Sequence, residues 1–454
     1  MKVAAAAMLA TLLAGCVGPM PRAPDAAHVQ PPVAWRTSVG PTIPATTTWW
    51  THFGDPVLTQ LVEQALANNP DVAIAAARVA EARAQERVAR SQLLPSLDLG
   101  VSASRSRSLS ALGRATESTV AQPVFQAAYE VDLSGRLRDQ VEASRETTLA
   151  TDAAREATTL SVAAATASGY ITLRSLDARL DVARTTLKTR AEALRIARSR
   201  AQAGYTSQLE LRQAQAEFEA AAQIVPQVEL AIARQENALH VLAGTPPGPV
   251  PRGLPPSQLL PPPVPEGLPS DLLRRRPDIA QAEYTLAASD ANLAVARAQF
   301  LPQVRLAATA GGLFTRALPD PIAIWSIGGS ILAPLFNGGR LRAQADVAAS
   351  RRDQAAFAYQ RTVLNAFREV DDALAATVSL AQQRSALQAE VDALTDALRH
   401  ATNRYQAGYT SYLEQLDAQR ALLNAQLALV QARADELNAR VALFQAMGGG
   451  WTMQ

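Results

Sequence analysis

The sequence has little of what enzymes, metalloproteins and nucleic-acid-binding proteins use. It contains one cysteine, four histidines and only two lysines among 454 residues, and its formal net charge is +2. The histidines are too scattered to suggest a metal site, and so small a net charge presents no basic surface to nucleic acid. The phosphate-loop pattern and the Gly-x-Ser-x-Gly pattern are also missing. We therefore expect a protein that is not an enzyme, with no catalytic residue, metal, cofactor or nucleic-acid partner.

The first residues predict export. Lys2 precedes an apolar run that ends at Ala14, which is too short to span a bilayer as a helix but suits a signal peptide over 1–15. The run continues into Gly15-Cys16, which resembles the bacterial lipobox, so Cys16 is the expected site of lipidation. Val17 follows the cysteine, and a residue other than aspartate there implies sorting to the outer membrane. The alternative is an ordinary buried cysteine.

Segments rich in proline or glycine are expected to lack a core of their own. Residues 16–50 hold seven prolines between Pro19 and Pro44 and are interpreted as a lipidated, extended tether. Residues 245–270 hold eleven prolines, which no helix or central strand tolerates, and are interpreted as a linker. Residues 448–454 begin with three glycines and are interpreted as a flexible tail.

The two halves of the chain repeat each other. The segment Asn69-Pro70-Asp71-Val72-Ala73 recurs 207 residues later as Arg276-Pro277-Asp278-Ile279-Ala280. The hexapeptide Gln202-Ala203-Gly204-Tyr205-Thr206-Ser207 recurs unchanged 204 residues later as Gln406-Ala407-Gly408-Tyr409-Thr410-Ser411. We expect one architecture built twice, over 51–244 and 271–447, with the linker between the copies.

Each half contains one predicted β-hairpin. Apolar and polar residues alternate over about 96–108 and 120–133, and again over about 303–314 and 323–336. A soluble sheet shows the same alternation, but an isolated hairpin is marginally stable and no further strands flank either one. Weak alternation over about ten residues is typical of outer-membrane strands. Because four strands cannot close a barrel and lipid tolerates no open sheet edge, several chains must share one barrel.

Long helices are predicted to follow the hairpins. Residues 137–203 and 341–407 contain no proline, and at about 1.5 Å per residue each helix would be on the order of 100 Å long. Both carry the three-and-four spacing of a coiled-coil seam, and this length excludes a helix on a globular core. The seam residues are Leu173, Leu176, Leu180, Ala183, Leu187, Arg190, Leu194 and Ala197, and then Leu380, Arg384, Leu387, Val391, Leu394, Leu398 and Ala401. Other helices are expected over 57–90, 209–243, 272–297 and 413–447.

Several motifs together resemble a known family. They are the lipobox, Trp49-Trp50 with Phe53-Gly54-Asp55-Pro56, Leu272-Leu273-Arg274-Arg275-Arg276-Pro277-Asp278, Leu335-Phe336-Asn337-Gly338-Gly339-Arg340, and the stretch from Ala407 to Gln419. Over nearly the whole chain, they resemble the NodT branch of the TolC-like outer membrane factors. The resemblance implies a mixed α and β fold in a homotrimer, in which four strands per chain form a twelve-stranded β-barrel in the outer membrane. The helices would then form a long coiled-coil barrel in the periplasm.

The resemblance also implies a gate and a docking surface. In relatives, acidic side chains ring a constricted periplasmic entrance, and links from a tyrosine and basic residues hold it shut. By position, the candidate gate residues are Tyr405, Glu210, Leu413, Glu414, Asp417 and Arg420. The helix turns expected to contact an adaptor contain Gly204, Tyr205, Thr206, Gly408, Tyr409 and Thr410. The alternative for the carboxylates is that they only cap the N-termini of helices.

The favoured function is a passive exit duct in a tripartite efflux system. The resemblance implies two protein partners, a periplasmic adaptor and an inner-membrane pump of the RND type, and contact with outer membrane lipid. The alternatives are an exit channel for type I protein secretion and a structural coiled-coil lipoprotein without a pore. The hairpins argue against the structural lipoprotein, and the lipobox with the Leu-Arg-Arg-Arg-Pro-Asp stretch favours drug efflux over protein secretion. No motif in the sequence identifies the transported substrate.

Overall fold

A computed structural model describes residues 24–37, 42–44, 46–109, 111, 113–316 and 319–453. The predicted signal peptide and Cys16 lie outside the described residues. The chain divides into two compact units, each of which draws on both sequence repeats. The unit that we call the strand unit contains the described residues up to His28, Ala77–Asp152 and Gln281–Arg361. The other, the helical unit, contains Val29–Ala76, Ala153–Ala280 and Thr362–Gln454.

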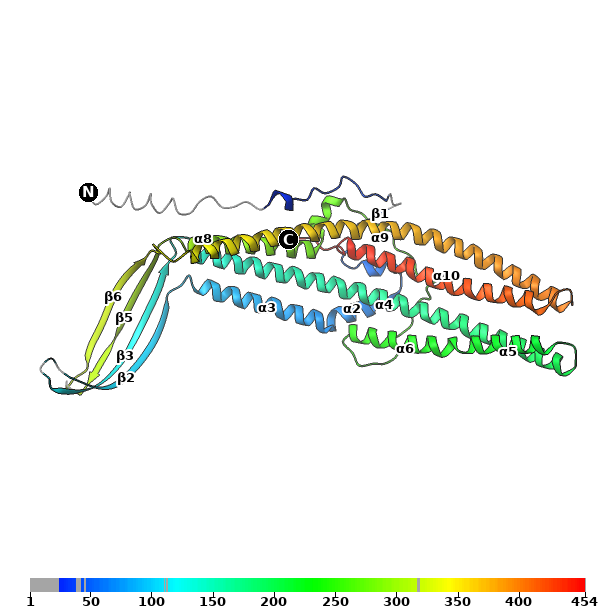
Figure 1. Ribbon diagram of the computed structural model, residues 1–454, viewed down its shortest axis with the longest axis horizontal. Coiled ribbons are helices and arrows are strands. Elements are labelled where there is room, and N and C mark those ends of the chain that lie inside the picture. The colour runs from blue at the N-terminus through cyan, green and yellow to red at the C-terminus, as the bar shows by residue number, and fades with distance from the viewer. Residues whose placement is uncertain are drawn as a thin grey trace. The chain divides into compact units, whose positions relative to one another are not determined.

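The strand unit is built around one antiparallel sheet of four strands (Figure 1). Its strands are β2 (Ser96–Leu109), β3 (Ala115–Val131), β5 (Gln303–Thr315) and β6 (Ile322–Leu332). They pair in the order β2-β3-β5-β6, so the two hairpins of the repeats join through β3 and β5. Both β2 and β6 therefore have an edge that pairs with no strand in the described part of the chain.

The two faces of this sheet differ in chemistry. The register places one set of alternating residues on a common face, which we call the apolar face: Leu97, Leu99 and Val101 of β2, Phe125 and Tyr129 of β3, Leu306 and Phe314 of β5, and Trp325, Ile327 and Ile331 of β6. The opposite face, which we call the polar face, carries small and polar residues such as Ser102, Ser104, Gln122, Gln126, Thr309 and Ser326. Large apolar side chains of the apolar face are exposed on a single chain.

Three strand boundaries differ from the prediction by two residues or more. The strand β3 begins at Ala115 instead of 120, because residues 115–120 pair with the outer part of β2. It ends at Val131 instead of 133, since the Asp132 carboxylate accepts backbone hydrogen bonds from the start of the following helix. The strand β6 ends at Leu332 instead of 336, and Pro334 in the lost segment has no N–H to donate to a sheet ladder.

The long helices have the predicted length. They are α4 (Arg136–Gln202) and α9 (Arg340–Gln406), of 67 residues each. The seam is buried at Leu173, Leu180, Ala183, Arg190, Leu194 and Ala197 of α4, and the corresponding residues of α9 are half-buried except for the buried Ala401. No helix in the described segments has the length and apolar composition needed to cross a membrane.

The shorter helices are more interrupted than predicted, and each break involves a proline. Helix 57–90 is split into α2 (Pro56–Asn68) and α3 (Pro70–Ser91), and helix 272–297 into α7 (Leu272–Arg275) and α8 (Pro277–Ala298). Helix 209–243 is split into α5 (Gln208–Ala222) and α6 (Ile224–Leu242) just before Pro226, whereas α10 (Tyr412–Ala446) is continuous. A proline disfavours the helical conformation of the preceding residue, and both Asn69 and Arg276 are extended. Pro226 instead lacks the backbone donor that would bond to the carbonyl of residue 222, where α5 ends.

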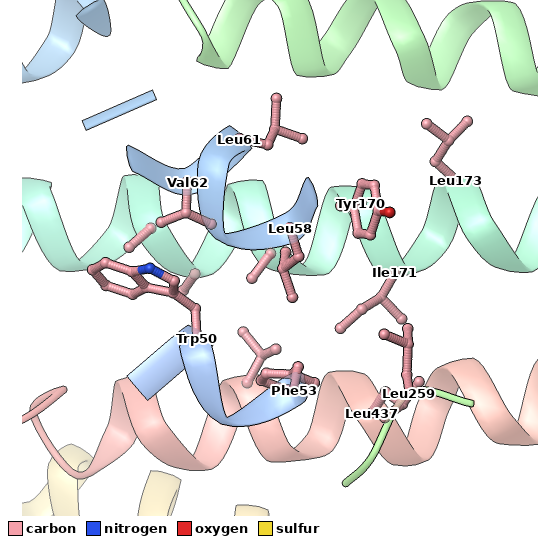
Figure 2. Close-up of a cluster of buried hydrophobic side chains, with 14 of the residues drawn as sticks. Trp50, Phe53, Leu58, Leu61, Val62, Tyr170, Ile171, Leu173, Leu259 and Leu437 are labelled. Carbon is pink, nitrogen blue, oxygen red and sulfur yellow. The ribbon is translucent and has the colours of Figure 1, made fainter. Parts of the chain in front are cut away.

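The hydrophobic core of the helical unit includes residues from the two segments that were predicted to lack a core. Trp49 and Trp50, from the predicted tether, are buried beside Phe53 in the turn η2 (Trp49–Phe53), against α2, α4 and α10 (Figure 2). Leu259, from the predicted linker, is buried in the same cluster. The tether and the linker also pair with each other through β1 (Thr42–Ile43) and β4 (Val264–Pro265). The boundary of the tether at residue 50 was therefore wrong, because large aromatic side chains gain most from burial.

The glycine-rich C-terminal segment is packed and is not a flexible tail. Gly448 has a φ of +86°, and a Cβ atom added there would lie 1.8 Å from the carbonyl oxygen of Arg275. The first repeat has the same arrangement, since a Cβ atom at Gly244 would lie 2.3 Å from the carbonyl oxygen of Asn68. Each repeat thus ends with a glycine that lets the returning helix close onto the joint between the two shorter helices.

The residue before the helix-breaking proline completes this closure. Asn69 donates a hydrogen bond from Nδ2 to the carbonyl oxygen of Leu242, at 2.9 Å. Arg276 donates from Nη1 to the carbonyl oxygen of Ala446, at 3.0 Å, and also pairs with Glu369 at 2.8 Å. The carbonyl groups at a helix C-terminus have no partner within the helix, so both side chains cap the returning helices.

Candidate gate at the helix turns

Two equivalent turns connect the long helices to the returning helices. Gly204 follows α4 with a φ of +75°, and Gly408 follows α9 with a φ of +78°. In both turns the tyrosine after the glycine donates its backbone N–H to a carbonyl five residues earlier, at 2.8 Å for Tyr205 and 2.9 Å for Tyr409. This is the Schellman arrangement that a left-handed glycine permits at a helix end. The identical hexapeptides therefore fold identically.

The tips of these turns project into solvent. Tyr205 and Tyr409 are 85% and 81% exposed, and Gly204, Gly408 and Leu413 are also exposed. Thr206 and Thr410 are half-buried. Exposed aromatic side chains at two matching turns form a surface suited to a protein partner.

A small hydrophobic cluster holds the two turns together. Its buried residues are Leu194 and Ala197 of α4, Ala214 of α5, and Tyr412 and Leu416 of α10. Tyr405 of α9 packs against the cluster, with its ring centroid 5.6 Å from that of Tyr412. Burial raises the pKa of Tyr412. All four helices of the turns thus contribute to one cluster.

Tyr405 forms the centre of a polar link between the repeats. Its hydroxyl donates a hydrogen bond to Glu210 Oε1 and accepts one from Arg200 Nη1 at 3.1 Å. The Arg200 guanidinium also lies 5.3 Å from the centroid of the Tyr405 ring, within reach of a cation–π interaction. The second oxygen of Glu210 accepts from Thr206. This set, which we call the tyrosine link, joins α9 of the second repeat to α4 and α5 of the first.

The tyrosine link is expected to weaken at high pH. Burial, followed by the bond to Glu210, raises the pKa of Tyr405 from 10.0 to about 12. A pKa above the unfolded value means that the link contributes its full stability below about pH 10 and loses it as the pH rises towards about 12. We therefore expect the difference in melting temperature between the parent and Tyr405→Phe to shrink from pH 10 to pH 12. A difference that stays constant over this range contradicts the assignment.

A second ionic group lies further from the tips, and we call it the arginine link. Glu217 of α5 accepts hydrogen bonds from Arg420 of α10, at 2.8 and 2.5 Å, and forms an ion pair at 3.3 Å with Arg190 of α4. Arg190 is only 3% exposed and also donates to Gln419. Burial lowers the pKa of Arg190, whereas the hydrogen bond to Glu217 raises that of Arg420. The single carboxylate of Glu217 is therefore shared by two guanidinium groups.

The structure separates the predicted gate residues into three places. Tyr405 and Glu210 meet in the tyrosine link, and Arg420 belongs to the arginine link. Glu414 is exposed and pairs with Arg404 at 3.4 Å, while Asp417 and Leu413 are exposed on α10. The backbone of α5 is capped by the Ser207 hydroxyl, which accepts from the N–H of Glu210 at 3.2 Å. The Glu210 carboxylate, by contrast, bonds to side chains.

Three members of these links were missed from the sequence. Arg190 occupies a seam position, where a buried charge requires a partner, and that pattern could have pointed to it. Glu217 lies seven residues after Glu210 and so on nearly the same helix face. Arg200 is the first-repeat counterpart of Arg404, but nothing in the sequence says which arginine meets the tyrosine. Within the described segments, no group of three or more His, Cys, Asp or Glu residues could hold a metal ion.

Comparisons with known proteins agree over almost the whole chain. The sequence model of the family described as outer membrane efflux protein matches residues 61–245 and 268–449. The probable efflux pump outer membrane protein TtgC of Pseudomonas putida is 35% identical over 467 residues, which cover 99% of this chain and 95% of the relative. The outer-membrane channel OprN has a TM-score of 0.87 and 31% identity, covering 96% of this chain and 99% of its own. The CmeC outer membrane channel of Campylobacter jejuni has a TM-score of 0.87 and 26% identity, with coverages of 96% and 95%.

Proposed function

Because the chain belongs to the outer membrane efflux protein family, we propose that three copies of it share one β-barrel and form the exit duct of a tripartite efflux system. The protein is an outer-membrane component of an efflux pump, and its family is one of transport proteins.

The main support for a shared barrel is the four-stranded sheet, whose two edge strands each have an unpaired edge in the described part of the chain. Both β2 and β6 have a free edge within the described residues, and the apolar face is exposed along the sheet. In lipid, such an edge leaves backbone groups without hydrogen bonds at a cost of several kcal/mol each. Pairing β2 of one chain with β6 of the next removes every edge. Three chains then give twelve strands, with the apolar face towards lipid and the polar face towards the bore.

The helix turns are the proposed docking surface for the periplasmic adaptor. The exposed Tyr205 and Tyr409 lie on identical turns, so a trimer presents six matching tips. An adaptor that binds one tip can bind all six, and it connects the duct to an inner-membrane pump, which we propose is of the RND type. Efflux is favoured over type I protein secretion because the relative TtgC is named as an efflux pump protein. We also propose that Cys16 carries a lipid anchor, which mass spectrometry of the mature N-terminus tests.

The tyrosine link and the arginine link are the proposed locks of a periplasmic gate. Each joins a helix of the second repeat to helices of the first repeat, so α9 and α10 cannot move away from α4 and α5 while both links hold. Glu414 and Asp417 are three residues apart on α10, and threefold symmetry would bring three copies of each to one axis. Rings of carboxylates at that entrance would select cations. Opening is then an iris-like movement of the helix tips.

Single-channel conductance in a planar bilayer tests the gate. Tyr405→Phe removes the donor to Glu210, and Arg420→Ser removes two hydrogen bonds to Glu217, so their combination is expected to raise conductance severalfold. Glu414→Ala with Asp417→Ala is expected to weaken cation selectivity. Arg195→Ser is the matched control, since Arg195 is exposed and pairs only along its own helix with Glu192 in the described structure. If all these variants conduct like the control, the constriction lies elsewhere.

A further inference from the structure

The apolar face of the sheet ends near the hairpin turns of the strand unit, where only Leu109 of the large apolar residues on that face of β2 lies beyond the boundary. Along β5 the face runs from Val304 to Phe314. Ten steps of about 3.4 Å at a tilt of about 40° correspond to a height of about 26 Å, close to the apolar band of outer-membrane barrels. The boundary lies near the hairpin turns, at the opposite end of the strands from α3 and α4. Since the helices extend into the periplasm in this family, the boundary lies at the outer leaflet.

Arginines replace the apolar residues at this boundary. On β2, Leu97, Leu99 and Val101 are followed on the same face by Arg105 and Arg107, which are 69% and 72% exposed at the side chain. Arg316 directly follows β5 and is exposed. These three residues, which we call the arginine row, continue the lipid side of the sheet and do not face the bore.

The strand register places two members of the arginine row, Arg105 and Arg316, at one level. Arg105 lies opposite Thr119 of β3. The pairing of Val120 with Thr315 places Arg316 beside Thr119 on its other side. Arg105 and Arg316 are thus two strand spacings apart, about 10 Å. Arg107 lies two residues further towards the turn, opposite Glu117. A row of cations at the upper limit of an apolar band fits a lipid whose head group carries phosphates.

We propose that the arginine row binds the phosphate groups of the phosphorylated glycolipid that forms the outer leaflet of the outer membrane. Arginine recognises phosphate through two parallel N–H donors, and each arginine near an anionic membrane surface strengthens binding by about fivefold. The acyl chains of the same lipid lie against the apolar face below. This inference rests on the proposed barrel, because only a closed barrel turns that face towards lipid.

Glu117 makes the proposal testable in both directions. Its carboxylate pairs with Arg105 at 2.9 Å and lies 4.0 Å from Arg107, so it competes with phosphate for the same guanidinium groups. Removing the acid is expected to strengthen lipid binding, whereas removing the arginines weakens it. Beyond the row, Arg114 and Asp320 in the turns carry one charge of each sign. Because these two charges cancel, they do not change the net positive charge of the arginine row with Glu117.

Binding of purified lipid A to the detergent-purified protein tests the proposal, with EDTA present to remove bridging cations. Native mass spectrometry compares bis-phosphorylated lipid A with the same lipid after dephosphorylation. We expect Arg105→Gln with Arg107→Gln and Arg316→Gln to weaken binding of the phosphorylated lipid by about a hundredfold, and Glu117→Gln to tighten it severalfold. Dephosphorylated lipid A should bind the parent and the triple variant equally weakly.

One control variant and three contrary results complete the test. Arg305→Gln is the matched control, because Arg305 lies on the polar face at the other end of β5, near Glu130 at 3.7 Å. Equal binding of the two forms of lipid A, unchanged binding by the triple variant, or equal affinity for phosphatidylglycerol overturns the glycolipid site. The mass of the particle is measured on the same samples. A trimer that does not bind lipid A contradicts only the glycolipid site. The absence of a trimer also contradicts the shared barrel.

Discussion

Gly448→Ala is expected to lower the free energy of unfolding by about 3 kcal/mol or more, as overpacking and backbone strain act together. The added Cβ would lie 1.8 Å from the carbonyl oxygen of Arg275, which is backbone and cannot rotate away. The φ of +86° adds the strain that any L residue meets in the left-handed region. The contact joins the end of α10 to the break between α7 and α8, where Arg276 also caps α10.

The melting temperature of the detergent-purified protein is the measurement for this substitution. Gly408→Ala is the matched control, because Gly408 has a similar φ of +78° but nothing within 4 Å of the added Cβ. Gly408→Ala should lower the free energy of unfolding only through backbone strain, by about 1 to 2 kcal/mol. Gly244→Ala, in the first repeat, should behave like Gly448→Ala. Equal melting temperatures for the Gly448 and Gly408 variants would show that the C-terminal segment is not packed against Arg275.

Glu217→Ala is expected to destabilise the protein by about 3 to 5 kcal/mol, because it leaves a buried guanidinium without its carboxylate. Arg190 is 3% exposed and pairs with Glu217 at 3.3 Å. With the carboxylate gone, the Arg190 side chain keeps its hydrogen bond to Gln419 and its interaction with the Tyr412 hydroxyl, but both partners are neutral. The same substitution also frees Arg420, so we expect the gate to open more readily.

A surface ion pair of α4 provides the control for the Glu217→Ala substitution. Glu229 of α6 pairs with Arg184 of α4 at 2.8 Å, but both side chains are about half exposed. Glu229→Ala should therefore cost no more than about 1 kcal/mol. Replacing Arg190 with leucine in the Glu217→Ala background should restore part of the lost stability, since it removes the unpaired charge. Equal melting temperatures for the Glu217→Ala and Glu229→Ala variants contradict the arginine link.

The sequence predicts the long elements well because their boundaries have strong local signals. Residues 137–203 and 341–407 contain no proline and end at a glycine, and α4 and α9 match these stretches almost to the residue. The breaks at Pro70, Pro226 and Pro277 were missed, because a proline is also acceptable in the first turn of a helix. Whether such a proline begins a new helix or bends an old one depends on what the next helix packs against.

Contacts between distant segments determine which residues are buried where local composition gives no signal. Trp49 and Gly448 lie in segments rich in small residues or proline, yet both pack in the helical unit. For the gate, periodicity identifies Arg190 as a seam residue but not Glu217 as its partner, because the partner lies on another helix. The resemblance to a family predicted Tyr405 and Glu210 as gate residues but not as hydrogen-bond partners. Sequence patterns thus predict which face is buried, and the structure supplies the partner.

The mass of the detergent-purified protein tests the shared barrel most directly. Light scattering with correction for bound detergent measures the number of chains in the particle without assuming a structure. We expect a monodisperse particle of three chains, because three pairs of β2 and β6 edges are needed to close twelve strands. A monodisperse monomer would leave both edges open in lipid, and it would contradict the shared barrel, the duct and the gate built on it.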